Sequence, residues 1–107
     1  MGMQPGRYEL GHYNVIVTAN DARLEDGTLA GSILRLDQAV RNMLAYTGCS
    51  LAEAVRMASA TPAHLLGLNN MGGIAVGNSA DLAVLSPENE ITHTFIAGQL
   101  AFQRSAN

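Results

Sequence analysis

"LDQAVRNMLAYTGCSLAEAVRMASATP", residues 36–62, decides the middle of the fold, because its apolar residues recur at helical spacing. Over 36–47 they fall three and four positions apart, which predicts one amphipathic helix. Gly48 is suited to the left-handed position at which many helices end. Asp37 and Arg41 are spaced for an ion pair on the surface of that helix.

Two shorter helices are expected to follow. Ser50 and Glu53 have the spacing of a capping box, which predicts a helix over 50–59. The threonine–proline pair at 61–62 is typical of a helix start, with an N-cap residue before a proline in the first turn. We therefore expect a third helix over about 62–66.

Short strands are predicted on both sides of these helices. Residues 7–24 contain alternating or β-branched runs separated by turn residues, which predicts a small antiparallel meander. The last third of the chain has three such runs, at 80–86, 91–98 and 99–103. Strands, then helices, then strands indicate a mixed α/β fold without a long linker.

"EDGTLAGS", residues 25–32, combines a turn signal with small residues. Asp26-Gly27 is one of the strongest local turn signals. The small residues and the second glycine after it would let this backbone come close to another backbone or to a ligand. From the residues alone, both a substrate-contacting loop and a tight strand-to-helix turn remain open.

The bulk composition excludes several classes of protein. At 107 residues the chain is at most one ordinary domain, and its net charge of −3 is mild. Its six basic residues are all arginine and are scattered, so we expect no nucleic-acid partner. No apolar run approaches the roughly 20 residues that span a bilayer, and no leader segment is visible. The single cysteine suits a reducing cytoplasm, which is the expected location.

No motif in the chain makes a catalytic site by itself. His12, His64 and His93 are far apart and lack the close pairing of metal ligands, so structural histidines are favoured. Cys49 lies near a helix start, where a thiol can become nucleophilic, but no histidine is near it in sequence. Asp81, before an apolar strand, is expected to cap a turn rather than to act in catalysis.

Three stretches together resemble the N-acetylglucosamine-6-phosphate deacetylases, which belong to the amidohydrolase superfamily. They are "ARLEDGTLAGSILRLDQAVRNML", "SLAEAVRMASATPAHLLGL" and "GGIAVGNSADLAVLSPENEITHTFIAGQLAF". The last stretch carries a "G-x-x-ADL-x-V" ending that indicates only the superfamily. "DGTLAGS" followed by "DQAVRN" is more particular to the deacetylases. The resemblance covers about residues 7–102.

The resemblance implies a fold that this chain only partly contains. The full enzyme is a (β/α)8 barrel with a small β-sandwich, and a complete barrel needs roughly 250 residues. Residues 1–79 would be the last barrel segment, with its meander and closing helices. Residues 80–107 would be the C-terminal strands of the sandwich. The chain would thus be the C-terminal portion of an incomplete barrel.

The resemblance also implies a reaction and a substrate site. The full enzyme hydrolyses an amide to give acetate and glucosamine 6-phosphate, using a divalent metal, zinc or iron. Its metal ligands and proton-handling aspartate precede the matched stretch, so we expect neither catalytic residues nor a metal in this chain. Leu29, Ala30 and Gly31 would border the amino-sugar phosphate near its acetamido group.

Two alternatives stay open beside an inactive fragment of a deacetylase. The chain could be a non-catalytic module that associates with itself, or the C-terminal segment of another amidohydrolase. Helix stripes and strand edges that a complete barrel would cover predict a homo-oligomer in either case.

Overall fold

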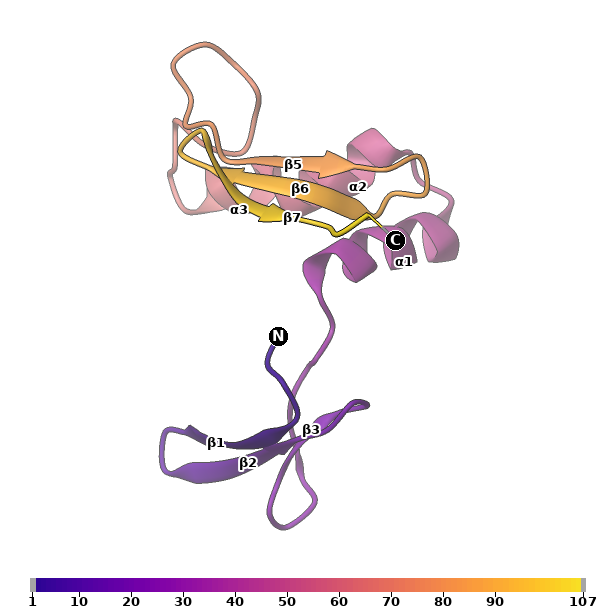
Figure 1. The fold of residues 1–107 in the computed structure, drawn as a ribbon, viewed down its shortest axis with the longest axis vertical. Coiled ribbons are helices and arrows are strands. Elements are labelled where there is room, and N and C mark those ends of the chain that lie inside the picture. The colour runs from indigo at the N-terminus through magenta and orange to yellow at the C-terminus, as the bar shows by residue number, and fades with distance from the viewer. Residues whose placement is uncertain (1, 107) are drawn as a thin grey trace. The chain divides into compact units, whose positions relative to one another are not determined.

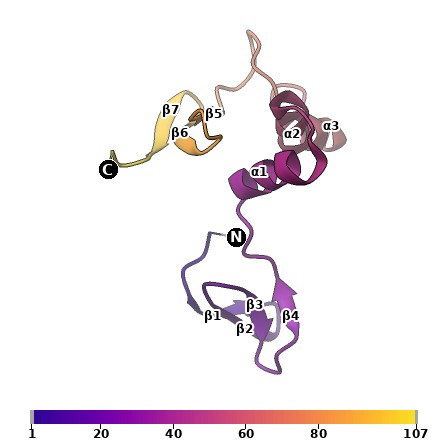
Figure 2. The ribbon, with the colours of Figure 1, turned by 90° about the vertical axis from the view of Figure 1, so that its right-hand side faces the viewer.

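The N-terminal unit of the computed structural model, which describes residues 2–106, is an antiparallel sheet in a segment that ends at Arg35 (Figures 1 and 2). Its strands run in the sheet order β1-β2-β3-β4. They are β1 (Gly6–Leu10), β2 (Tyr13–Val17), β3 (Ala22–Leu24) and β4 (Leu29–Gly31). The predicted meander is therefore confirmed.

Alternation along β2 creates the core of this sheet. Val15 and Val17 point to one face, and Ala22 of β3, the register partner of Val17, joins them. Each of the three is less than a tenth exposed. Gly11, with φ of 61°, forms the left-handed position of the β1–β2 turn. Half-buried side chains that pack against the cluster are those of Tyr8, Leu24, Ala30 and Ile33.

The stretch 25–32 is a turn followed by a strand, not a loop. The Asp26-Gly27 turn is confirmed: Gly27 has φ of 88°, and the Thr28 N–H donates to Asp26 Oδ1 at 2.9 Å. The Leu24 N–H then donates to the Thr28 carbonyl at 2.8 Å. This bond aligns the returning chain with β3, so that residues 29–31 pair with it as β4 despite their glycine.

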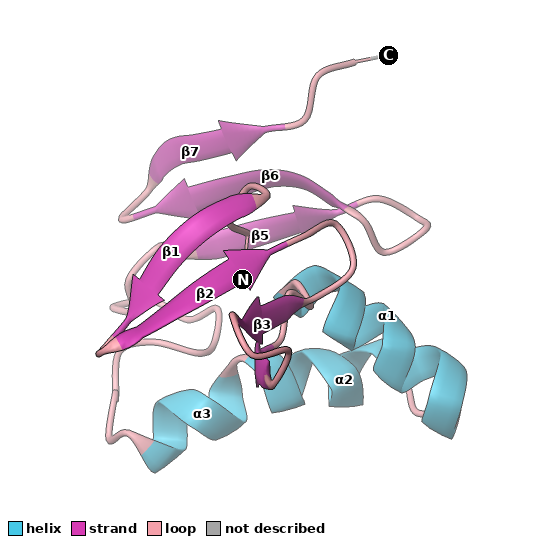
Figure 3. Cartoon of the chain, turned by 90° about the horizontal axis from the view of Figure 1, so that it is seen from below, coloured by secondary structure: helices cyan, strands magenta, loops and turns pink. Residues whose placement is uncertain are grey.

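Helices begin the second unit, which starts at Leu36 (Figure 3). They are α1 (Leu36–Thr47), α2 (Leu51–Ala58) and α3 (Ala60–Leu65). The bounds of α1 agree with the prediction, and Gly48 ends it with φ of 69° and an N–H that donates to the Leu44 carbonyl. The capping box of α2 is also confirmed, since Ser50 and Glu53 accept from each other's backbone N–H.

The start of α3 corrects the sequence prediction. The helix begins at Ala60, and Thr61 and Pro62 lie within its first turn. Proline is tolerated there because the first N–H groups of a helix have no partner within the helix. Ser59 occupies the N-cap position, but its hydroxyl donates to the Val55 carbonyl at 2.6 Å and leaves α3 without a side-chain cap.

The second sheet consists of β5 (Leu82–Leu85), β6 (Ile91–Ile96) and β7 (Gln99–Gln103), antiparallel in that order. A tight turn joins β6 to β7 through Ala97 and Gly98, both left-handed with φ of 50° and 79°. Such paired positive values are typical of the turns that match strand twist. The described residues thus form two small antiparallel sheets and three helices, without a closed barrel.

No helix in the described part of the chain is long and apolar enough to cross a membrane.

Gly72 brings the loop after α3 close against that helix. An added Cβ would lie 2.7 Å from Ala63 Cβ and 3.1 Å from Ala60 Cα, and the backbone φ of Gly72 is 85°. Gly77, with φ of 92°, has open space around the same position. Comparing substitutions at Gly72 and Gly77 therefore distinguishes the cost of steric overlap from the cost of left-handed backbone, which both positions share.

We expect Gly72→Ala to destabilise the chain more than Gly77→Ala. Both substitutions pay about 1–2 kcal/mol for an alanine in left-handed conformation. Gly72→Ala adds overpacking against α3, which costs about 1–3 kcal/mol. Urea unfolding followed by far-UV circular dichroism measures the difference, and equal midpoints would contradict the close approach of this loop to α3.

Candidate functional site

A groove of about 530 Å³ lies on the core side of the N-terminal sheet. Ala30 and Gly31 of β4 line it, whereas Leu29 does not. The segment before β1 forms another wall, where the Tyr8 hydroxyl donates to the Gln4 carbonyl at 2.8 Å. Two of the three residues predicted to border a substrate therefore face one concave surface.

The three residues of β4 offer a ligand mainly their backbone. Ala30 is half-buried against the core cluster, and the Leu29 side chain is 64% exposed. A Cβ built on Gly31 meets no atom within 4 Å, and the φ of Gly31 is not left-handed. Since β4 is an edge strand of its sheet, one side of its backbone has no strand partner among the described residues.

Two carboxylates in the turns before and after β3 accept hydrogen bonds that stabilise those turns. The Thr28 backbone N–H holds the pKa of Asp26 below its ordinary value. Arg23 donates to Asp21 at 2.6 Å and, with Thr18, lowers the pKa of Asp21. Both carboxylates are thus ionised hydrogen-bond acceptors that stabilise turns, and neither is tuned to act as a general base at neutral pH.

The histidines do not come together. His12 lies in the β1–β2 turn, His64 on α3, and His93 on β6, where its Nδ1 is 3.0 Å from Thr92 Oγ1. Among the described residues, no group of three His, Cys, Asp or Glu side chains could hold a metal ion. The donor set present in residues 2–106 therefore does not fit the divalent metal that the resemblance implies.

Cys49 and Asp81 both have local structural contacts. Cys49 is a half-buried free thiol between α1 and α2, and its N–H donates to Thr47 Oγ1 at 3.2 Å. Asp81 Oδ1 accepts the Ala97 N–H at 2.8 Å. The expectation that Asp81 caps a turn is confirmed, and the turn is the one between β6 and β7.

Two features near β4 had no signal in the sequence. The edge position of β4 depends on its pairing with β3. The turn between the two strands is equally compatible with a following loop, so its residues do not predict a strand. The groove also depends on the segment before β1, which lines it and is joined to β1 by the hydrogen bond from Tyr8 to Gln4. Alternation along β1 and β2 indicates only which face of the sheet is apolar.

Comparison with known proteins identifies relatives over most of the chain. Residues 14–101 match the model of the amidohydrolase family. The N-acetylglucosamine-6-phosphate deacetylase of Lysinibacillus sphaericus is 43% identical over 102 residues, which are 95% of this chain and 26% of that protein. The N-acetylgalactosamine-6-phosphate deacetylase of Escherichia coli O157:H7 is 41% identical over 101 residues, 94% of this chain and 27% of that protein.

A solved structure shares the fold of the matched region. The crystal structure of the N-acetylglucosamine-6-phosphate deacetylase from Thermotoga maritima is similar with a TM-score of 0.80 at 40% sequence identity. The match covers 96% of this chain and 28% of that one. The chain therefore spans about a quarter of the length of such relatives.

Proposed function

Because this chain belongs to the amidohydrolase family, we propose that it is the C-terminal part of a deacetylase that acts on N-acetylglucosamine 6-phosphate. The observation that carries this proposal is identity of about 40% to such deacetylases along nearly the whole chain, together with the TM-score of 0.80. Another amidohydrolase is disfavoured by "DGTLAGS" followed by "DQAVRN". Within the full enzyme, residues 1–79 would close the barrel and residues 80–107 would complete the small sandwich.

In this proposal β4 borders the substrate at its acetamido group. The exposed backbone edge of Leu29–Gly31 supplies N–H and C=O groups that hydrogen-bond an amide, and the open space at Gly31 permits close approach. The groove that Ala30 and Gly31 line lies beside this edge and has room for part of a ligand. The contribution of this chain is to bind and orient the sugar.

The chemistry belongs to residues outside those described. The proposed reaction breaks the acetamido bond by addition of water, giving acetate and the free amino sugar 6-phosphate. When bound, the zinc or iron of the full enzyme would polarise the acetamido carbonyl. Residues 2–106 bring together no set of ligands for such a metal. A polypeptide of this sequence alone is accordingly inactive.

A second substrate has specific support. The Escherichia coli O157:H7 relative is named for the galactosamine compound and is nearly as similar as the glucosamine enzymes. The two sugars differ only in the orientation of one ring hydroxyl, whereas β4 is proposed to border the acetamido group that both share. Comparing deacetylation of the two sugar phosphates by the full-length protein decides between them.

We propose that the chain by itself forms a homo-oligomer and that the protein is cytoplasmic. The facing stripes of α1 and α2 leave an apolar groove of about 140 Å³, and several of its side chains remain well exposed, with Leu36 at 52% and Met57 at 50%. Covering this face removes apolar surface from water. The residues lining the groove are Leu36, Ala39, Val40, Met43, Ala54, Met57 and Ala58. A module that only associates in this way, without a role in catalysis, is the alternative proposal.

The isolated 107-residue polypeptide is expected to release no acetate from N-acetylglucosamine 6-phosphate, with or without added zinc or iron. The reason is the donor set of the described residues, which assembles no metal site. Acetate is measured enzymatically against a control without protein and against a full-length relative. Metal-dependent release above the protein-free control would refute the assignment of the chemistry to other residues.

Gly31→Val in the full-length enzyme is expected to raise KM with little loss of stability. The valine side chain would enter open space on a backbone that is not left-handed, so the fold should tolerate it. A higher KM would therefore report a clash between this side chain and the substrate. Gly27→Val is the control for a folding defect, because Gly27 is left-handed and equally uncrowded. Unchanged kinetics for Gly31→Val at parental Tm would mean that β4 does not border the substrate.

The isolated chain is expected to be an oligomer at micromolar concentration, with a two-fold dimer as the simplest closed form. Light scattering over a dilution series measures the mass. Replacing the exposed Met57 with Glu places a charge in the apolar groove and should shift the equilibrium toward monomer. Glu in place of the exposed Ala52, which does not line the groove, is the matched control. A folded monomer at all concentrations would contradict association.

A further inference from the structure

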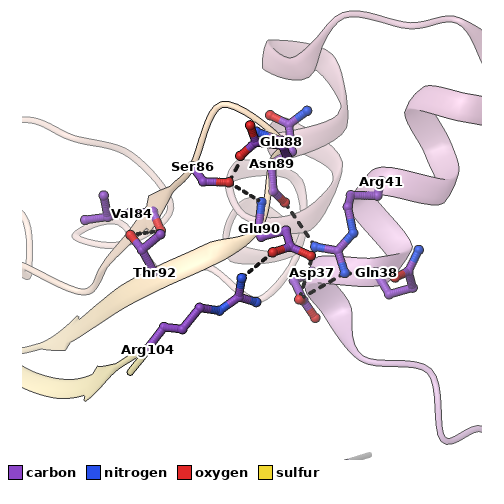
Figure 4. A network of polar contacts seen from close by, with 10 residues as sticks. All are labelled: Asp37, Gln38, Arg41, Val84, Ser86, Glu88, Asn89, Glu90, Thr92 and Arg104. Carbon is purple, nitrogen blue, oxygen red and sulfur yellow. Dashed lines mark hydrogen bonds and ion pairs between the residues drawn. The ribbon is translucent and has the colours of Figure 1, made fainter. Parts of the chain in front are cut away.

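A polar cluster joins α1 to the turn between β5 and β6 (Figure 4). The Arg41 guanidinium lies at its centre. Its Nη1 donates to the backbone carbonyl of Asn89 at 3.0 Å, across 48 positions of sequence. Both terminal nitrogens also reach Asp37 Oδ2 at 3.2 Å, and Nη2 donates to Gln38 Oε1 at 2.8 Å.

The partners of Arg41 on α1 hold the guanidinium in place. Asp37 is one helical turn before it, so the expected ion pair is confirmed. The side chains of Arg41 and Asp37 are 19% and 11% exposed. The pair is therefore shielded from water and fixed in one orientation, unlike an exposed surface pair whose energy is close to zero.

The turn that receives Arg41 is itself well defined. The Asn89 N–H donates to the Ser86 carbonyl at 2.9 Å, and the Ser86 N–H donates to the Glu90 carbonyl at 2.8 Å. Asn89 is left-handed, with φ of 60°. Arg104, just after β7, pairs with Glu90 and ties the end of the sheet to the same turn. Arg41 thus holds a preformed acceptor.

No described side chain of this sheet is fully buried, and residues 91–95 are only half-buried, so apolar packing alone attaches the sheet weakly. In the described part of the second unit only Ala54 and Ala63 are buried, and both are on helices. The covalent connection enters the sheet at Leu82, the start of β5, whereas Arg41 holds the turn at the other end of β5. Without Arg41, the sheet would be attached mainly at one end.

We propose that Arg41 is a clasp that fixes the β5–β7 sheet to α1, and that releasing it lets the sheet swing about the 66–81 loop while the helices and the sheet each keep their structure. The proposal concerns the fold of this chain and does not depend on the proposed substrate or reaction.

Spin labels on the two layers test the clasp. In a Cys49→Ser background of the 107-residue chain, nitroxides are placed at Tyr46→Cys on α1 and Ala101→Cys on β7, both exposed positions. The labelled chain is diluted in an excess of unlabelled chain, so that the distances measured lie within one copy even where the chain associates. Double electron–electron resonance spectroscopy gives the distribution of distances between the two nitroxides. We expect a narrow distribution in the parent, and a broad one shifted to longer distances in Arg41→Met, with the far-UV circular dichroism retained.

Two further variants keep the test decisive. Arg56→Met removes an arginine from α2 that is not part of the cluster, and it should leave the distribution narrow. Arg41→Lys keeps the charge beside Asp37 but lacks the planar fork that also reaches Asn89, so it should broaden the distribution. A narrow distribution in both Arg41 variants, a broad one in the parent, or loss of helical signal in both Arg41 variants would each overturn the proposal.

Discussion

Hydrogen bonds between residues close in sequence hold most of this structure, because the described residues bury few side chains. The buried set comprises small and medium side chains, and the largest apolar ones remain partly in water. Caps and turns therefore set where elements begin and end: the Ser50–Glu53 box opens α2, and Asp26 and Thr28 build the turn into β4. The long-range bond from Arg41 to Asn89 is notable against this background of local contacts.

How far the fold follows from the sequence depends on the range of the interaction concerned. The helix α1 was predicted with its observed bounds because both its stripe and its C-terminal glycine are local signals. The start of α3 was predicted two residues late, since a threonine–proline pair suits the inside of a first turn as well as its edge. Strand β4 was not predicted because it forms through hydrogen bonds to β3. Residues 29–31 alone carry no pattern that indicates this pairing.

The candidate site was harder to derive from residues than the fold. "EDGTLAGS" indicated a turn followed by backbone able to approach a partner, and only the family resemblance pointed to a sugar phosphate. The fold then distinguished the three residues: Ala30 packs inward, Leu29 is exposed, and Gly31 leaves open space. A site made of backbone edges has no signature in side-chain chemistry, so histidines and carboxylates give no signal for it.

Asp81 stabilises the backbone of the β6–β7 hairpin at a left-handed residue. Ala97 is left-handed, a conformation that alanine adopts at a cost, and the carboxylate of Asp81 binds its N–H across the start of the hairpin. The aspartate of the "ADL" stretch thereby compensates for an unfavourable residue at position 97. Because the donor is a backbone N–H, every residue except proline at position 97 could make the same bond, so Asp81 fixes the hairpin independently of the side chain there.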